Sequence, residues 1–238
     1  MKRLLALLLF GLLAVTCSKD DGSSKDDENI APDKDLPQLP DSDDVCLDMN
    51  DIVFMKYCYN NFDSNKDGSL STSEALAVRS IDLEGSNVND LKGIEHFQNL
   101  ESLNCKNCEK LQSMDISHNL KLTKIGNSAF EGCISLTNIS IPDSVTEIGD
   151  SAFSVCVRLI DITIPENVTK IESQAFSECS HLSIVHCKPT TPPQLDSNAF
   201  YANDFGQIIY VPTESVSAYK SASGWSNYSF RIVGYDFQ

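Results

Sequence analysis

A repeat of 23 residues in the second half of the chain is the feature that most constrains the fold. Residues 137–159 and 160–182 align without a gap, and they share isoleucines, a proline, a valine, an Ala-Phe pair and a cysteine at equivalent positions. A less regular copy precedes them and ends at Leu136. A fixed period of this length predicts a solenoid, because one short unit cannot bury its apolar face without a neighbour.

Each unit contains two short segments with the alternation of a β-strand. The first, L-x-x-I-x-I-x-x-[N/S], runs through residues 136–144 and 159–167, and related lines occur at 100–108 and 111–119. This is the strand pattern of leucine-rich repeats. The second is a series of apolar pairs 22 or 23 residues apart, namely Val78/Ile81, Leu100/Leu103, Leu122/Ile125, Val145/Ile148 and Val168/Ile171.

We therefore predict a leucine-rich-repeat solenoid of short β-strands stacked in about five coils. Apolar side chains should point inward, with the Phe of each Ala-Phe pair filling the interior. The strand residues between the inward ones should face solvent and offer a binding surface, and they include Thr137, Ser140, Asp161 and Thr163.

The repeat Ile-x-Ile-Pro-x-x-Val-x-x-Ile-x-x-x-Ala-Phe-x-x-Cys-x-x-Leu resembles the BspA-like leucine-rich-repeat family of bacterial surface proteins, over residues 81–238. The C-terminal stretch, with Pro192-Pro193 and Trp225, resembles the piece that closes such arrays. The resemblance implies a solenoid over residues 81–187 and an α+β cap over 188–238. It also implies a secreted or anchored protein that adheres to host matrix proteins or to other cells, without a family-wide set of binding residues.

Residues 63–74, DSNKDGSLSTSE, match the calcium-loop motif D-x-[DN]-x-[DN]-G-x₅-E at every specified position. Calcium prefers oxygen ligands, and Gly68 stands where the loop must turn sharply. The predicted ligands are Asp63, Asn65, Asp67, the carbonyl of Ser69, Ser71 directly or through water, and Glu74. Apolar residues at helical spacing flank the loop, so we predict an EF-hand-like, α-helical N-terminal cap over residues 45–80.

The calcium loop has two interpretations, as a structural staple or as a sensor. Sensor hands normally occur in pairs, whereas the chain contains one such motif, and we therefore expect a staple that is filled at extracellular calcium concentrations. The loop also resembles one half of a dockerin, whose two loops pair in tandem, but a second D-x-N-x-D loop does not occur in the sequence.

The N-terminus has the pattern of a secretory signal. Met1-Lys2-Arg3 is followed by an apolar run over residues 4–15, which is too short to span a membrane. The sequence Ala-Val-Thr-Cys that ends at Cys17 resembles the lipobox of bacterial lipoproteins, although Thr16 departs from the usual small residue. Either Cys17 is lipidated, which we favour, or cleavage nearby releases a soluble protein; both alternatives export the chain.

Residues 17–44 are rich in Asp, Ser, Pro and Lys, and they contain too few apolar side chains to fold. We predict a signal peptide over residues 1–16, then the lipid-bearing Cys17 and a disordered acidic tether to residue 44. The residues Ser18 to Asp21 resemble the short acidic tags of lipoproteins sent to the outer face of the outer membrane. We therefore expect the protein at the cell surface, held to the membrane by the lipid.

The net charge of −16 makes nucleic acid and anionic lipid poor partners. Cys105-x-x-Cys108 is a metal or redox motif in some proteins, but both cysteines lie at positions that the repeat pattern places inside, so we expect them to pack. Cys133, Cys156 and Cys179 share one repeat position and should form a buried ladder. The candidate disulfides are Cys46–Cys58 and Cys179–Cys187.

The sequence favours a binding protein over an enzyme, because it contains no G-x-S-x-G, no Gly-rich phosphate loop and no H-E-x-x-H. We expect a monomer that binds an extracellular protein or glycan. The alternative is a scaffold subunit of a surface glycan-uptake or assembly complex, which would bind another bacterial protein. A hydrolase assembled from residues remote in the sequence is the third hypothesis, and turnover of peptide or glycan substrates would identify it.

Overall fold

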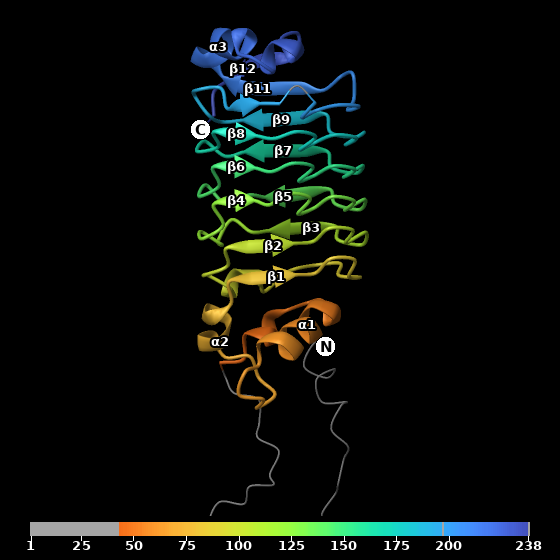
Figure 1. The fold of residues 1–238 in the computed structure, drawn as a ribbon, viewed down its shortest axis with the longest axis vertical. Helices are drawn as coiled ribbons and strands as arrows, with labels where there is room; N and C mark the ends of the chain where they lie inside the picture. Colours follow the sequence, from red (N-terminus) through yellow and green to blue (C-terminus); the bar gives the residue numbers. More distant parts are fainter. Residues whose placement is uncertain (1–42, 197, 238) are drawn as a thin grey trace, which may run out of the picture. The chain divides into compact units, whose positions relative to one another are not determined.

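The computed structural model describes residues 43–196 and 198–237. Within them, two short helices precede a stack of parallel strands (Figure 1). The predicted signal peptide, Cys17 and the tether up to residue 42 lie outside the described residues. The helical segments before the strands are the 3₁₀ turn η3 (Val45–Asp48), α1 (Ile52–Phe62) and α2 (Thr72–Ala77).

Both α-helices begin at side chains that satisfy free backbone N–H groups. Asp51 caps α1, because its carboxylate accepts hydrogen bonds from the N–H groups of Val53 and Phe54. Ser71 and Glu74 form a reciprocal capping box at the start of α2. The positions of these two helices therefore follow from local sequence.

The strands form two lines, which we call line A and line B. In line A, β1 and β2 form one parallel pair, and β4, β6, β8 and β10 form a parallel sheet in that order. Strand β2 packs beside β4. Its strands are β1 (Ser80–Asp82), β2 (Ser102–Asn104), β4 (Lys124–Ile125), β6 (Glu147–Ile148), β8 (Lys170–Ile171) and β10 (Gln194–Leu195).

In line B, β3 and β5 form one parallel pair, and β7, β9, β11 and β12 form a parallel sheet in that order. Strand β5 packs beside β7. A single bridge from Asp90 to Ser113 extends the line by one coil toward the helices. Its strands are β3 (Ser113–Asp115), β5 (Asn138–Ser140), β7 (Asp161–Ile164), β9 (Ile184–Cys187), β11 (Ile208–Pro212) and β12 (Ile232–Tyr235).

Strand pairing extends beyond the solenoid boundary that the sequence predicted at residue 187. Strand β10 pairs with β8, β11 pairs with β9, and β12 pairs with β11, so each line has six strands in the described residues where we expected about five coils. The added coils were missed because they lack the Ile-Pro and Ala-Phe-x-x-Cys spacing of the regular repeats. The helical segments η5 (Thr213–Ser215), α3 (Val216–Ser221) and η6 (Trp225–Tyr228) lie between β11 and β12.

A stack of phenylalanine rings fills the interior, as the repeat predicts. Phe130, Phe153, Phe176 and Phe200 are at most 2% exposed, and successive ring centroids lie 5.2, 5.2 and 5.3 Å apart with nearly parallel planes. The ring separation is close to the spacing of hydrogen-bonded strands. Each coil therefore places its ring on the ring of the coil before.

The predicted cysteine ladder is also present, and each thiol has a backbone partner. Cys133, Cys156 and Cys179 are fully buried, and their Sγ atoms donate to carbonyl oxygens of the preceding coil at 3.1 Å. Burial raises the pKa of Cys133 and of Cys179 to about 12, so both remain thiols. The eight cysteines of the described residues are unpaired, so neither candidate disulfide is formed in this structure.

The turns of successive coils use left-handed backbone positions. One such position recurs in five coils and holds Asn107, Gly132, Val155, Glu178 and Ala202, all with φ between 57 and 72°. Asn and Gly tolerate this conformation, whereas a β-branched side chain is strained in it. Val155, with φ of 62°, is therefore a strained position that stacking of the coils holds in place.

We predict that Phe153→Ala lowers the free energy of unfolding by about 3–5 kcal/mol, because it opens a cavity in the middle of the ring stack. Urea unfolding followed by circular dichroism measures the change. Phe205→Ala is the matched control: Phe205 is 92% exposed, so its loss should change stability by less than about 0.5 kcal/mol. Similar effects of the two variants would contradict the assignment of the stack as the core.

We also predict that Val155→Asn raises the free energy of unfolding by about 1 kcal/mol, because asparagine adopts the left-handed conformation with less strain. The control is Val157→Asn, since Val157 is equally half-buried but has no positive φ. A loss of stability in Val155→Asn, measured in the same urea titration, would show that packing of the valine outweighs its backbone strain.

Candidate functional site

The predicted calcium ligands occupy the loop between α1 and α2. Asp63 is the C-cap of α1, and its Oδ2 atom accepts a hydrogen bond of 3.0 Å from the Gly68 N–H. Gly68 has a φ of +86° with open space beside it, so the backbone turn, not crowding, requires glycine here. Asn65 and Asp67 exchange hydrogen bonds at 2.7 and 2.9 Å across the turn.

The Glu74 carboxylate closes the loop from the first turn of α2. Its Oε1 accepts from the N–H and hydroxyl of Ser64 at 2.9 and 2.8 Å, and its Oε2 accepts from the N–H and hydroxyl of Ser71 at 3.0 and 2.8 Å. Desolvation raises the pKa of Glu74, but these donors outweigh it and lower the pKa to about 2. The carboxylate is therefore ionised and bridges the two ends of the loop.

One carboxylate oxygen in the loop has no partner. Asp63 Oδ1 is buried and accepts no hydrogen bond, which is costly for an ionised oxygen. Within the described residues, no group of three His, Cys, Asp or Glu side chains is gathered as metal ligands, and Glu74 is turned toward backbone N–H groups. Asp63, Asn65, Asp67 and Glu74 are oxygen donors of the kind that calcium prefers, and a cation would satisfy the orphaned Asp63 Oδ1 atom.

Two residues that the sequence analysis assigned to the tether belong to the folded part. The Val45 N–H donates to the carbonyl of Leu70 at 2.9 Å, and the carboxylate of Asp44 accepts from the Leu70 N–H at 3.1 Å. Asp43 Oδ1 accepts from the Thr72 hydroxyl at 2.6 Å. This N-terminal segment thus satisfies both backbone groups of Leu70 in the loop. Short-range sequence patterns do not reveal this contact, because it joins two segments far apart in the chain.

Side chains of the α1 region also tie the loop module to the first coil. Asp51 Oδ2 accepts from the Asn89 N–H at 2.7 Å, and the Tyr57 hydroxyl accepts from the Asp82 N–H at 3.0 Å. Desolvation acts to raise the pKa of Asp51, but the N–H groups of Asn89 and of the helix start lower it overall. The helix before the loop is therefore tied to the start of the solenoid.

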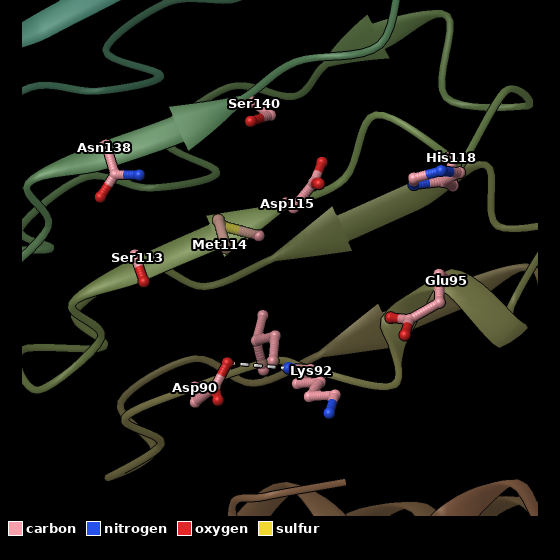
Figure 2. Close-up of a pocket in the computed structure, with 10 residues that line it drawn as sticks. Asp90, Lys92, Glu95, Ser113, Met114, Asp115, His118, Asn138 and Ser140 are labelled. Carbon is pink, nitrogen blue, oxygen red and sulfur yellow. Dashed lines mark hydrogen bonds between the residues drawn. The ribbon is translucent and has the colours of Figure 1, made fainter. Parts of the chain in front are cut away.

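A hollow of about 530 Å³ lies on the outward face of line B near its first strands. Figure 2 shows side chains from β3, β5, the segment around η4 (Ile94–His96) and the turn after β3 directed around it. It carries acidic, basic, amide, hydroxyl and imidazole groups, from Asp90, Lys92, Glu95, Ser113, Asp115, His118, Asn138 and Ser140. Such a mixture can donate and accept several hydrogen bonds to one ligand.

Most polar groups of the hollow retain a free donor or acceptor. Asp115 Oδ1 accepts from the Ser117 N–H and Asp90 Oδ1 from the Lys92 N–H, both at 2.9 Å, and these bonds shape the turns. Strand alternation marks Asp115, Asn138 and Ser140 as outward, and Ser140 was among the predicted surface residues. The sequence did not predict the hollow, because its lining residues come from three segments that are far apart in the chain.

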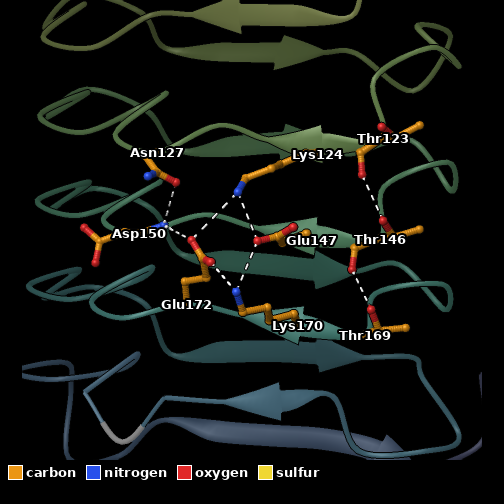
Figure 3. A network of polar contacts seen from close by, with 9 residues as sticks. All are labelled: Thr123, Lys124, Asn127, Thr146, Glu147, Asp150, Thr169, Lys170 and Glu172. Atoms are coloured by element: carbon orange, nitrogen blue, oxygen red, sulfur yellow. Dashed lines mark hydrogen bonds and ion pairs between the residues drawn. The ribbon is translucent and has the colours of Figure 1, made fainter.

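The outward face of line A differs from that of line B around β4, β6 and β8, where side chains of successive coils contact one another (Figure 3). Lys124, Glu147, Lys170 and Glu172 form a chain of ion pairs across β4, β6 and β8, in which the ammonium of Lys170 lowers the pKa of Glu172. The hydroxyls of Thr146 and Thr169 donate to threonine carbonyls of the preceding coils, both at 3.2 Å. These groups therefore satisfy one another across successive coils. Farther along line A, a second hollow of about 530 Å³ lies beside Lys170, Glu172 and Gln194.

Comparisons with known proteins support the repeat architecture. The model of the BspA type leucine rich repeat region matches residues 86–223 in six copies. No curated protein gives a significant match. In the described residues, none of the helices has the length and apolar character needed to cross a membrane.

Three solved structures are similar to the chain at low identity. A leucine-rich repeat protein from Bacteroides ovatus is 21% identical over 57% of this chain and 40% of its own, with a TM-score of 0.32. A leucine rich cell surface protein from Faecalibacterium prausnitzii is 15% identical over 63% and 54%, with a TM-score of 0.36. An internalin from Listeria monocytogenes is 12% identical over 83% and 78%, with a TM-score of 0.28.

The chain thus spans about half or less of the first two of these proteins. The family match is broader, since it covers more than half of the chain and includes strands of both lines. The chain belongs to the family of proteins with BspA-type leucine-rich repeats.

Proposed function

We propose that this protein is displayed on a bacterial surface and binds an extracellular protein or glycan through the outward face of line B. The hollow over β3, β5 and residues 90–95 carries the proposal, because polar side chains surround it and retain free hydrogen-bonding atoms. Family membership supports a binding role, since leucine-rich-repeat proteins generally act as binding scaffolds and not as enzymes.

Export and anchoring are supported by the N-terminal sequence. The charged start, the short apolar run and Cys17 together favour a signal peptide followed by a lipidated cysteine. Two acyl chains would hold the protein on a membrane far more firmly than one, because each buried CH₂ contributes about 0.8 kcal/mol. The acidic residues after Cys17 favour display at the outer face of the outer membrane.

We further propose that calcium binds between α1 and α2 and acts as a structural staple. The ligands would be Asp63, Asn65, Asp67, the Ser69 carbonyl, Ser71 and Glu74. The support is the loop motif together with the buried Asp63 Oδ1 atom, which has no hydrogen-bond partner and would gain one favourable contact with the ion. Stabilisation would reach the first coil through Asp51 and Tyr57.

We predict that millimolar calcium increases protection from hydrogen exchange over residues 45–78 and leaves the coils after β4 unchanged, because coils contact only their neighbours. At a calcium concentration 100 times the Kd, the gain should be about 2–3 kcal/mol for the N-terminal part. Glu74→Gln should abolish this gain, whereas Glu109→Gln, at an exposed glutamate, should retain it. Equal protection with calcium and with a chelator would contradict the proposal.

Glu74→Gln also tests what the Glu74 charge contributes without metal. The pKa of Glu74 in the folded protein, about 2, lies below its ordinary value of 4.5. Ionised Glu74 therefore stabilises the fold above pH 4.5, and this stabilisation disappears as the pH falls toward 2. In chelator, the stability difference between wild type and Glu74→Gln should therefore be constant above pH 5 and shrink below pH 4. A difference that does not depend on pH would show that the charge is not responsible.

We predict that the purified protein binds at least one member of a panel of matrix proteins and polysaccharides, and that Asn138→Arg weakens this binding about ten-fold or more. The arginine would occupy the hollow, whose rim includes Asn138 on β5. Asn60→Arg, at an exposed position of α1, is the matched control and should bind like wild type. Equal binding by both variants would remove the hollow from the site, and silence of the whole panel would contradict the proposed function.

A further inference from the structure

The last strands of line B carry a cluster of aromatic side chains on the outside of the solenoid, which we call the aromatic patch: His186, Tyr210, Tyr235 and Phe237. The imidazole of His186 stacks on Tyr210 with 5.4 Å between centroids, and Tyr235 lies 5.2 Å from Tyr210. Phe237 follows β12 and lies 5.0 Å from Tyr235. The four rings therefore form one continuous group across β9, β11 and β12.

Burial in the core does not account for this group. The inner phenylalanines are at most 2% exposed, whereas Tyr235 is 45% exposed and the other three rings of the patch are half-buried. Exposed aliphatic side chains border the rings, with Ile208 at 36% and Val233 at 45%. Contiguous, partly exposed rings bordered by exposed aliphatic side chains are a feature of many binding surfaces.

Strand register continues the patch into a polar surface. Tyr210 is opposite His186, and His186 is opposite Thr163 on β7, so aromatic and hydroxyl side chains follow one another along one column. The next strands toward the hollow present Asp161, Ser140 and Asn138 outward. One face of line B thus changes from small polar side chains near β5 to rings near β12.

The charge of this face narrows the class of ligand. None of the outward residues in the described strands of line B is Lys or Arg, and the whole chain has a net charge of −16. Nucleic acids and sulfated polysaccharides need several basic side chains, whereas these strands offer none and the hollow beside them offers Lys92. An apolar protein surface would match the rings but would leave the hydroxyl and carboxylate groups of β5 and β7 without partners.

A neutral polysaccharide can contact both the rings near β12 and the polar side chains of β5 and β7. A pyranose ring has apolar C–H faces that can stack on aromatic rings, and its rim of hydroxyl groups can bond the Tyr hydroxyls and the small polar side chains. A polymer of repeating units can also use equivalent positions on successive coils. We propose that the aromatic patch binds neutral polysaccharide chains, with a sugar stacked at Tyr235 and the chain continuing toward Thr163.

This inference rests on the proposed function and specifies the ligand class and the end of line B at which it binds. The probes are soluble xyloglucan, arabinoxylan, galactomannan, mixed-linkage glucan and dextran, with heparin as the anionic comparison, in affinity electrophoresis of the whole protein. At least one neutral polysaccharide should retard wild type. Tyr235→Ala should weaken that binding about ten-fold or more, and Tyr235→Phe should keep most of it because the ring remains.

Tyr201→Ala is the matched control, because Tyr201 is 61% exposed and lies in a turn outside the patch. Val233→Lys gives a second variant that keeps all four rings and adds a charge at an exposed position, so it tests the patch even where Tyr235→Ala misfolds. Both Val233→Lys and Tyr235→Ala should weaken binding while Tyr201→Ala does not. Equal behaviour of all three variants would place the site elsewhere.

Failure of this inference can be distinguished from failure of the proposed function. If the neutral polysaccharides do not bind but a matrix protein does, and Asn138→Arg weakens that binding, the ligand class is wrong and the proposed function stands. If heparin binds more tightly than every neutral polysaccharide, the charge argument is wrong. If neither polysaccharide nor matrix protein binds, both proposals are wrong.

Discussion

Parallel backbone pairing between successive coils is the interaction on which the rest of this structure depends. One coil of about 23 residues contains strands of only two to five residues and has no apolar interior of its own. The next coil supplies both the hydrogen-bond partners and the other side of the core. The stacked phenylalanine rings and the cysteine thiols use the same register, since each ring or Sγ atom contacts the coil before it.

A stack of this kind has two exposed ends, and helical segments cover both in different ways. At the start, Phe54 of α1 packs 6.3 Å from Phe97, and Asp51 holds the backbone of the first coil. At the other end, Trp225 packs 6.3 Å from Phe200, and its Nε1 atom donates to the carbonyl of Pro193 at 2.8 Å. Aromatic residues thus cover the core at both ends of the stack formed by the described residues.

The two outward faces of the coils differ in how their side chains contact one another. On line A, lysine and glutamate side chains from successive strands pair with one another, and these exposed pairs contribute modestly to stability. On line B, the outward residues of the described strands form no such ion pairs between coils. The groups that we propose to bind a ligand lie on this line, with polar side chains near β5 and rings near β12.

The sequence by itself determined the repeat architecture, the inward phenylalanines and cysteines, and the motif of the calcium loop, because each depends on periodicity or on residues within one short segment. It did not predict the coils formed by β10 to β12, the contact of Asp43 and Asp44 with the loop, or the hollow. It also did not predict the grouping of His186 with Tyr210 and Tyr235. Only the tertiary structure decided these features, because they depend on which irregular segments stack beside one another. Successive coils differ in length, so their strand register cannot be read from a fixed sequence period.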